Sequence, residues 1–438
     1  MKKYLFILIS FLTACGGGPK DLRDQVEKFR LENGLTVLLI KREGAPVFSG
    51  FIRIKVGAIE DPPGLSGMAH FFEHMAFKGT QTIGADIQNE FVRIYQRNGG
   101  SDLNATTSTD FTEYFVSLPS EKLPLWAYME SERLLHPVFR EFEKEREVVI
   151  EERRMRYEND PNGKLYEHFI REALQGTPYG KSVIGTPPEI LSITPMAAKA
   201  FREKNYIPSR MVVTLVGNFD ADLARREIKK YFGRLAPGPK ERSAAKPSHH
   251  TQGAREKVLS GSDEPRFYLG YPRPAYPHPD DAVFDAIQVL MCEGRTSRLF
   301  HSLVKEKNIA SKVDCYSSLP GSRLDSVFAF YAYPIGIAPN RDLQTALKAE
   351  LEKLKQAPPT GQELAKVKTK VKADLIWALK SNMGMAEWLS YFESLTGDWQ
   401  YLYRFQELIE KMTPADLQRV ARTYFVPENE VTVYLEKK

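Results

Sequence analysis

Two histidines and a glutamate in the run His70-Phe71-Phe72-Glu73-His74 have the residue types and spacing of a metal-dependent hydrolytic site. On a helix, positions i and i+4 lie on one face, so His70 and His74 can offer their imidazoles to one metal ion. Zinc lowers the pKa of a bound water to about 7. Glu73 lies one turn from His70 and can take a proton from that water. The motif therefore predicts a zinc site that is suited to hydrolysis of peptide bonds, although five residues alone also fit an ordinary helix with three polar side chains.

A third ligand is needed, because a catalytic zinc site usually has three protein ligands and one open position. Residues 141–157 predict a strong helix that ends near 159–163. Four of its residues follow i, i+3, i+4 and i+7 and share one stripe, namely Glu145, Val148, Val149 and Glu152. Two carboxylates among valines are costly to bury unless a cation lies opposite them. Glu152 is the candidate ligand, and Glu151 stays open as the alternative because helix periodicity does not separate the two.

The other glutamates of this segment fit a solvated, charged helix face. They are Glu141, Glu143, Glu147 and Glu151. On this interpretation they face water and bind nothing.

Residues 57–80, which contain the histidine motif, closely resemble the pitrilysin and mitochondrial-processing-peptidase family of inverzincin zinc peptidases. Shorter stretches elsewhere also match that family, namely residues 33–35, 99–107, 145–152 and 206–208. The resemblance covers residues 28–438 and is most specific over the first half of the chain.

The resemblance implies a role for each residue of the site. In the family, both histidines of the motif and a glutamate on a later helix bind one zinc ion, and the glutamate inside the motif is the catalytic base. A second glutamate, seven residues before the third ligand, supports the site. Carried over to this chain, the zinc ligands are His70, His74 and Glu152, the base is Glu73, and the supporting residue is Glu145. The resemblance thus favours Glu152 over Glu151.

Asn104 and Ala105, followed by Thr106 and Thr107, predict a short strand after the Gly99-Gly100 turn. The resemblance implies that this strand lies at the edge of a sheet and that the substrate pairs with it as an added strand. Backbone hydrogen bonds would then hold peptides or unstructured segments whatever their sequence. We expect Asn104 and Ala105 to bind substrate.

Residues 1–14 predict a signal peptide, because Met1-Lys2-Lys3 is basic and the following apolar run is too short to span a bilayer. Leu12-Thr13-Ala14-Cys15 resembles a bacterial lipoprotein box, which implies acylation of Cys15 and makes residues 15–27 a tether. Several acyl chains on one residue form a stable membrane anchor. With Gly16 after the cysteine, we expect a protein of the bacterial cell envelope, anchored in the outer membrane and facing the periplasm.

The formal net charge of +5 is spread over a chain with 27% charged residues. No basic cluster with interleaved aromatic residues is present in the sequence, which argues against nucleic acid as a partner. Besides Cys15, the chain contains Cys292 and Cys315. The sequence leaves open whether these two cysteines pair.

The chain of 438 residues is too long for one hydrophobic core, and it repeats internally. Thr194-Pro195, followed by a Pro-bounded strand, recurs 219 residues later as Thr413-Pro414, which indicates gene duplication. Residues 236–252 predict a linker between domains at 28–235 and 253–438. We expect an α+β fold of two homologous halves. By the resemblance, each half is an antiparallel sheet with helices on one side, and the two form a clam-like unit in which the second half lacks the zinc motif.

The second half also departs from the family at two positions. Many members carry an Arg and a Tyr there, seven residues apart, which reach the scissile carbonyl from the same chain or from a partner. Here the corresponding positions hold Val304 and Ser311. Such donors stabilise the developing oxyanion, and neither replacement can do so. We therefore expect the zinc-bearing half of a two-subunit peptidase whose homologous partner supplies the Arg-Tyr pair. The alternative is a non-catalytic structural or assembly subunit with the same fold.

Overall fold

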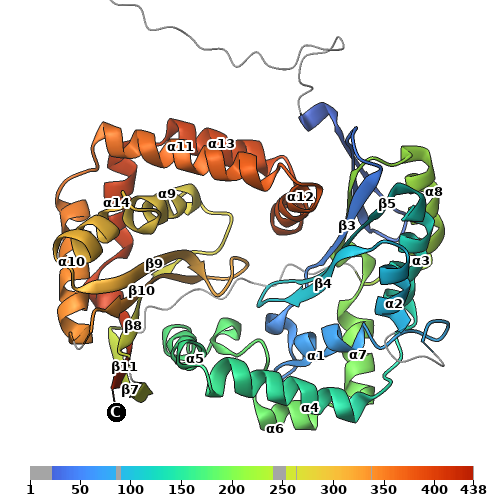
Figure 1. Cartoon of the computed structure of the whole chain (residues 1–438), viewed down its shortest axis with the longest axis horizontal. Helices are drawn as coiled ribbons and strands as arrows, with labels where there is room; N and C mark the ends of the chain where they lie inside the picture. Colours follow the sequence, from blue (N-terminus) through green and yellow to red (C-terminus); the bar gives the residue numbers. More distant parts are fainter. Residues whose placement is uncertain (1–21, 85–89, 240–252, 263, 337, 438) are drawn as a thin grey trace, which may run out of the picture.

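Two halves, each built on one β-sheet, lie side by side in the computed structural model (Figure 1). The structure describes residues 22–84, 90–239, 253–262, 264–336 and 338–437. Cys15, the expected signal peptide and residues 240–252 of the expected linker lie outside the described residues.

The first sheet has six strands in the order β1-β2-β6-β3-β5-β4. Their bounds are β1 (Val26–Arg30), β2 (Thr36–Lys41), β3 (Val47–Ile54), β4 (Ser101–Thr107), β5 (Thr112–Pro119) and β6 (Met211–Gly217). The second sheet has five strands in the order β7-β11-β8-β10-β9. Their bounds are β7 (Arg255–Ser262), β8 (Arg266–Arg273), β9 (Ala310–Leu319), β10 (Ser326–Pro334) and β11 (Val431–Lys437).

The helices fall into two sets, one in each half of the chain. The first half contains α1 (Met68–Met75), α2 (Glu90–Arg97), α3 (Leu123–Leu135), α4 (Phe142–Arg153), η4 (Arg154–Glu158, a π-helix), α5 (Pro161–Ala173), α6 (Pro187–Ser192), α7 (Pro195–Asn205) and α8 (Ala221–Phe232). The second contains α9 (Asp281–Cys292), η7 (Phe300–Glu306, a π-helix), α10 (Asn340–Gln356), α11 (Gly361–Ala378), α12 (Asn382–Thr396), α13 (Tyr401–Lys411) and α14 (Pro414–Tyr424). Short 3₁₀ turns connect several of these elements, namely η1 (Leu22–Asp24), η2 (Ala58–Glu60), η3 (Ser120–Lys122), η5 (Pro178–Gly180), η6 (Pro208–Arg210) and η8 (Pro427–Asn429).

The expected duplication is visible in the strand order. Apart from β1, the two sheets have the same order when β2, β6, β3, β5 and β4 are matched with β7, β11, β8, β10 and β9. The repeated Thr-Pro pairs begin α7 and α14, with Thr194 and Thr413 as the N-cap residues. Each of these helices leads through a 3₁₀ turn into an interior strand of its sheet, β6 or β11. The α+β fold of two homologous halves is thus as expected.

We expected antiparallel sheets, but each sheet contains one parallel pair of strands. In the first sheet β2 and β6 run parallel, and in the second β7 and β11 do. The remaining strand pairs are antiparallel. The exception arises because the last strand of each half, β6 or β11, returns after several helices and pairs with β2 or β7, and a parallel pair requires such a long connection.

Helices also cover both faces of each sheet, which the expectation of helices on one side did not include. Helix α12 of the second half packs on β3 and β6 of the first sheet, where Leu389 lies among Leu38, Ile40 and Val216. Conversely, α5 of the first half packs on β8 and β11 of the second sheet. The reason is that all seven residues of β6 are buried, so apolar side chains project from both faces and need cover. Each half therefore contributes one helix, α5 or α12, that covers a face of the other half's sheet.

The halves also meet through their hairpin turns. Asp110, in the turn between β4 and β5, accepts hydrogen bonds from the backbone of Ser322 at 2.6 Å and of Arg323 at 3.2 Å, in the turn between β9 and β10. Arg323 forms an ion pair with Glu60 at 2.8 Å. Equivalent turns of the two halves are thus joined, which fixes the halves relative to each other.

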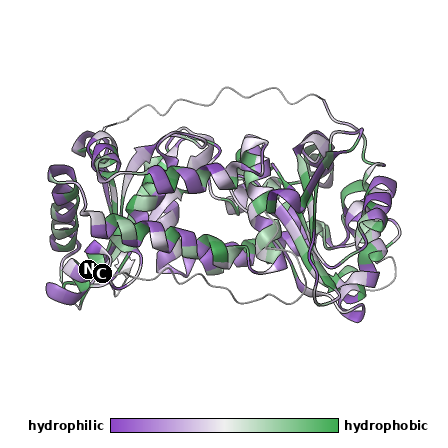
Figure 2. Cartoon of the chain, turned by 90° about the horizontal axis from the view of Figure 1, so that it is seen from above, coloured by the Kyte–Doolittle hydropathy of each residue, from purple (hydrophilic) through white to green (hydrophobic). Residues whose placement is uncertain are grey.

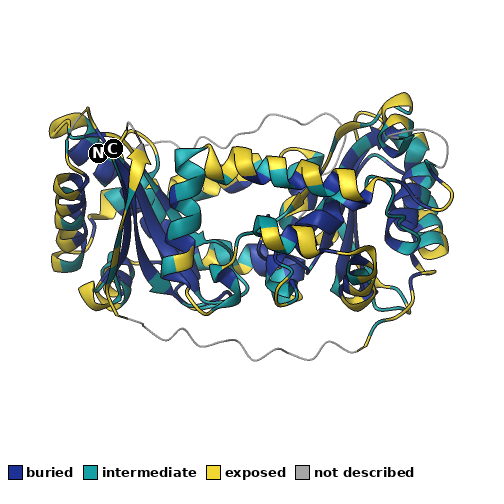
Figure 3. Cartoon of the chain, turned by 90° about the horizontal axis from the view of Figure 1, so that it is seen from below, coloured by how far each residue is buried: buried dark blue, intermediate teal, exposed yellow. Residues whose placement is uncertain are grey.

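The helices are amphipathic. Hydrophilic and hydrophobic residues alternate along them in Figure 2, and in Figure 3 buried strands lie inside helices whose outer faces are exposed. Among the residues that the structure describes, no helix is both long enough and apolar enough to cross a membrane.

The exchange of helices predicts that the stability of the first half depends on α12. Leu389 is fully buried against the first sheet, so Leu389→Ala should lower the free energy of unfolding by about 2–5 kcal/mol. Met196→Ala serves as the control because Met196 is 81% exposed. Urea unfolding followed by circular dichroism measures both variants. An unfolding midpoint of Leu389→Ala equal to that of the control would contradict the packing of α12 on this sheet.

Candidate metal centre

Helix α1 is held in place at its N-terminus by a buried carboxylate. Asp61 accepts hydrogen bonds from the backbone N–H groups of Gly67 at 2.7 Å and of Ala69 at 2.8 Å. Burial raises the pKa of Asp61 to about 8. Gly67 has φ 88°, and a Cβ there would lie 2.1 Å from the carbonyl oxygen of Ile184. Only glycine meets both conditions, so this position fixes where the helix begins.

The residues of α1 divide between the core and a cavity. Phe71 and Phe72 pack against Phe142 and Tyr206, with ring centroids 4.9 Å and 4.6 Å apart. The side chains of His70 and His74, four residues apart, point to the cavity side, as the helical spacing requires. Their ring centroids are 4.7 Å apart. Core packing on one face thus orients the two imidazoles on the other.

Helix α4 brings Glu145 and Glu152 to the same cavity. Val149 lies between them and is fully buried, whereas Val148 is 44% exposed, so our assignment of Val148 to this stripe was wrong. One further step of 100° carries Val148 round to the solvent side. Glu151, the alternative ligand, points outward and forms an ion pair with Arg154. The remaining glutamates of the predicted charged face, Glu141, Glu143 and Glu147, are also exposed.

The three residues expected to bind zinc lie together. Ligand atoms of His70, His74 and Glu152 are all within 4.8 Å of one another, and no other group of three such residues occurs among the described ones. The Oε2 atom of Glu152 lies 3.6 Å from Nε2 of His70 and 3.3 Å from Nε2 of His74. Two imidazole nitrogens and a carboxylate oxygen are a donor set of catalytic zinc sites, so these residues fit the ion.

Glu145 supports this group from behind. Its Oε1 atom lies 2.9 Å from Nδ1 of His74, and its Oε2 atom lies 2.5 Å from Nζ of Lys78. A carboxylate on Nδ1 fixes the ring so that Nε2 is left to bind a metal. Nδ1 of His70 is buried and has no hydrogen-bond partner in the described part of the chain, so only His74 has such support.

The pKa values of the three expected ligands show how each would be charged without a metal ion. Burial and the neighbouring His74 lower the pKa of His70 to about 4, so His70 is neutral at pH 7. Burial also acts to lower the pKa of His74, but its hydrogen bonds to Glu145 and Glu152 outweigh burial and raise it to about 9. Burial acts to raise the pKa of Glu152, but the hydrogen bond from His74 and the proximity of His70 and Arg156 lower it overall. A metal ion must therefore displace a proton from His74.

Glu73 lies beside the ligands, and burial raises its pKa. Its Oε2 atom accepts a hydrogen bond of 2.8 Å from Oγ1 of Thr107, at the end of β4. A cavity of about 620 Å³ is lined by the ligands, by Glu73 and by residues 104–107 of β4. Because β4 is the last strand of its sheet, its outer edge is free for pairing within the described structure. Asn104 and Ala105 thus lie on an edge strand at the metal centre.

Val304 and Ser311, which stand where many family members have Arg and Tyr, both lie away from the metal centre. Val304 lies in η7 and packs partly buried against the second core. Ser311 lies in β9, where its hydroxyl is 3.4 Å from the carbonyl oxygen of Tyr333. Neither side chain lines the cavity of the metal centre.

Three residues of the site were missed by sequence reasoning. Arg156 pairs with Glu152 at 2.8 Å, and Lys78 pairs with Glu145. Arg156 could have been found, since it follows Glu152 by four residues and the helix continues through η4. Lys78 lies beyond the end of α1 at Met75, so helical spacing does not place it. Thr107 was assigned only to a strand, and its contact with Glu73 depends on tertiary packing that carries no local signal.

The sequence and the fold were compared with known proteins. Residues 36–187 match the family model for "Insulinase (Peptidase family M16)", and residues 192–371 match the "Peptidase M16 inactive domain". The "Zinc protease PqqE" of Helicobacter pylori is 34% identical over 94% of this chain and 92% of its own length. The "Uncharacterized zinc protease YmxG" of Bacillus subtilis is 26% identical over 90% and 94%. The solved structure of "a protease from Helicobacter pylori" has a TM-score of 0.87 and 32% identity, over 94% of this chain and 99% of that one.

The carboxylate behind His74 leads to a prediction about metal affinity. Glu145→Ala should weaken zinc binding by about 10–100-fold, because the His74 ring loses the group that orients it. Glu147→Ala, an exposed position on the same helix, is the matched control. Competition with a chromophoric zinc chelator measures both affinities. If the two variants bind zinc equally well, Glu145 does not support the site.

Proposed function

Because the chain belongs to peptidase family M16, we propose that it is a zinc-dependent endopeptidase that hydrolyses peptides or unstructured polypeptide segments in the bacterial cell envelope. The observation that carries this proposal is the convergence of His70, His74 and Glu152 within 4.8 Å, with Glu73 in the same cavity. A non-catalytic structural role is the alternative. The retention of three ligands and a base argues against it.

In this proposal each residue of the centre has one task. His70, His74 and Glu152 hold one zinc ion, which when bound polarises a carbonyl group and lowers the pKa of water. Thr107 holds Oε2 of Glu73, which leaves Oε1 to take the proton of the attacking water and to pass it to the leaving nitrogen. The raised pKa of Glu73 suits both proton transfers, since a pKa closer to neutral pH lets the carboxylate both accept and release a proton.

The substrate would bind as an extra strand on β4. Its backbone would pair with the free edge of residues 101–107, which ends beside Glu73. Asn104 and Ala105 line the cavity, so they would lie next to the peptide near the bond to be cleaved. Only an extended segment can pair in this way, which makes folded domains poor substrates.

Two features support an envelope location. Cys292 and Cys315 form a disulfide, with Cα atoms 5.6 Å apart, and disulfides persist in oxidising compartments such as the periplasm. Cys15, outside the described residues, is the proposed site of lipid attachment, which would tether the protein to the membrane.

We also propose a homologous partner subunit. Val304 and Ser311 provide no hydrogen-bond donor at the metal centre, and a second copy of this chain would carry the same two residues. A subunit of similar fold with Arg and Tyr at these positions would supply the missing donors to the developing oxyanion.

The role of Glu73 is tested by one conservative change. Glu73→Gln should keep zinc but reduce kcat for a quenched fluorescent peptide by about 10²–10⁴-fold, since the amide cannot take the proton. His70→Ala should instead lose the metal, as measured by mass spectrometry of the native protein. Glu143→Gln on α4 is the control. Cleavage by Glu73→Gln at the wild-type rate would show that another group is the base.

The partner is tested by assaying the purified, zinc-loaded chain alone. We expect a rate on a quenched peptide library that is about 10²–10³-fold below that of the two co-expressed subunits, because the oxyanion donors are missing. Full turnover by the chain alone would refute the two-subunit proposal and would leave the zinc assignment standing.

A further inference from the structure

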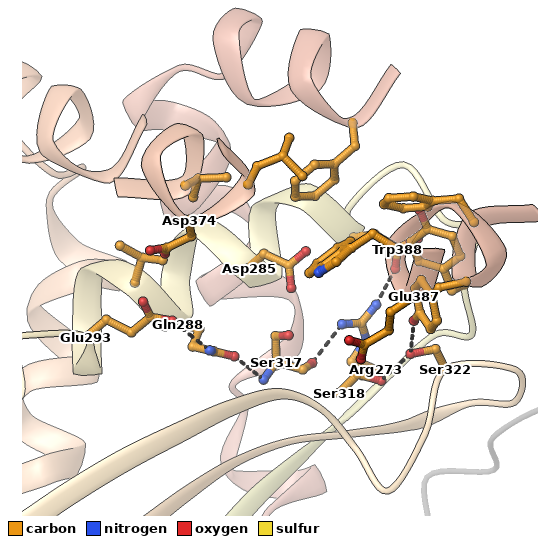
Figure 4. Close-up of a pocket in the computed structure, with 18 of the residues that line it drawn as sticks. Arg273, Asp285, Gln288, Glu293, Ser317, Ser318, Ser322, Asp374, Glu387 and Trp388 are labelled. Carbon is orange, nitrogen blue, oxygen red and sulfur yellow. Dashed lines mark hydrogen bonds and ion pairs between the residues drawn. The ribbon is translucent and has the colours of Figure 1, made fainter. Parts of the chain in front are cut away.

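A second cavity, of about 510 Å³, is lined mainly by residues of the second half (Figure 4). Its walls come from α9, β9, α11 and α12 of the second half, and Arg53 of β3 closes it from the first half. It shares no lining residue with the cavity of the metal centre. Its volume is within the range of small-molecule sites, which often lie between domains.

By the internal repeat, this cavity is the counterpart of the metal centre. Strands β3 and β8 correspond residue for residue at the offset of 219, and α4 and α11 begin at the same offset. Val289, Glu293 and Val371 follow His70, His74 and Glu152 by that offset, and all three line the second cavity. The hollow has thus been kept while two of its three metal donors have been replaced by valine.

The disulfide falls at the same place in this correspondence. Cys292 follows Glu73 by 219 residues, and it bonds to Cys315 on β9, just as Glu73 contacts Thr107 on β4. A covalent bond between α9 and β9 thus holds the wall of the second cavity where the first has a hydrogen bond.

Arg53 brings unsatisfied donors to this cavity. Its side chain is 3% exposed, and its Nη2 atom forms an ion pair with Glu113 at 2.7 Å. In the described part of the chain, Nε and Nη1 of Arg53 have no hydrogen-bond partner. Rings of Phe51, Phe111 and Tyr391 surround the guanidinium at 5.2–5.4 Å, but they accept no full hydrogen bond. Buried donors without acceptors are costly, so a ligand with an anionic group would be favoured here.

Two carboxylates in the same cavity lack a cation. Arg273 pairs with Asp281, and Lys370 pairs with Glu293 and Asp374. Asp285 and Glu387, by contrast, form no ion pair with any described residue. Burial raises the pKa of Asp285, which contacts Ser317, whereas Glu387 is an exposed residue. A ligand with an ammonium group would supply their missing partner.

We propose that this cavity binds a short peptide with free ends, with its carboxylate at Arg53, its ammonium group near Asp285 and Glu387, and its side chains against Trp388 and Phe392. A zwitterion of this size satisfies both kinds of unpaired group at once, and the aromatic wall accepts its apolar atoms. The proposal does not require the chain to be catalytically active.

A ligand in this cavity would also affect β4 at the metal centre, because a chain of contacts joins the two sites. Glu113, the partner of Arg53, accepts a hydrogen bond of 3.0 Å from Oγ1 of Thr106 on β4. The next residue, Thr107, faces the other side of the sheet and donates to Glu73. A ligand carboxylate at Nε and Nη1 of Arg53 shares the positive charge of the guanidinium with Glu113 at Nη2, so it weakens that ion pair and loosens the hold on the strand that is expected to receive substrate.

Binding is tested by calorimetric titration of the full chain with the dipeptide Ala-Phe, in zinc-loaded and zinc-free forms. We expect one site that persists without zinc and that does not bind N-acetyl-Ala-Phe-amide, which lacks both charges. Asp285→Asn and Glu387→Gln should each weaken binding at least tenfold. Glu121→Gln, an exposed carboxylate on the first half, is the control. The side chain of Glu387 is exposed, so its loss of charge should leave folding intact.

Absence of binding, or equal affinity in all variants and for the blocked peptide, would overturn the proposed site. Amide hydrogen exchange over residues 101–107 tests the link to the metal centre. Exchange there should increase when Ala-Phe is bound to the wild-type chain and should not change in Glu387→Gln under the same conditions. Bound dipeptide with unchanged exchange over these residues would overturn the coupling.

Discussion

The cost of placing carboxylates together in a half-buried cavity is the constraint on which the rest of the centre depends. Glu73, Glu145 and Glu152 meet around two imidazoles, and burial opposes ionisation of all three carboxylates. The protein offsets part of this cost with Lys78, Arg156 and a protonated His74. A divalent cation would offset far more, since removing one partner from a buried ionic group is strongly destabilising. The electrostatics, more than the motif alone, make a metal ion the natural occupant.

Duplication explains the architecture around this centre. Each half contributes a sheet with two apolar faces and lends a helix, α5 or α12, to the sheet of the other half. Neither half could fold in this form alone without exposing one of those faces. The same duplication produced two cavities, one with metal donors and one with valines at the matching positions. Joined turns at Asp110 and Arg323 keep both cavities in fixed relation.

Features that depend on local spacing could be predicted from the sequence, and features that depend on long-range packing could not. The i, i+4 spacing of His70 and His74 placed them on one helix face, and the repeat at Thr194 gave the two matching halves. The exchange of α5 and α12 has no local signal, because it joins residues hundreds of positions apart. Val148 was wrongly placed on the buried stripe of Glu145, Val149 and Glu152, because helical spacing alone allows a stripe that also includes Val148. Glu152 could be separated from Glu151 only through family resemblance, and the fold gives the physical reason by turning Glu151 to solvent.

The central claim is that one zinc ion is held by His70, His74 and Glu152. A crystal structure of the zinc-loaded chain, with anomalous scattering measured on both sides of the zinc absorption edge, tests it most directly. We predict one strong peak about 2.0–2.2 Å from an imidazole nitrogen of each histidine and from a carboxylate oxygen of Glu152. A peak at any other set of side chains, or no peak at this cavity at saturating zinc, would contradict the account.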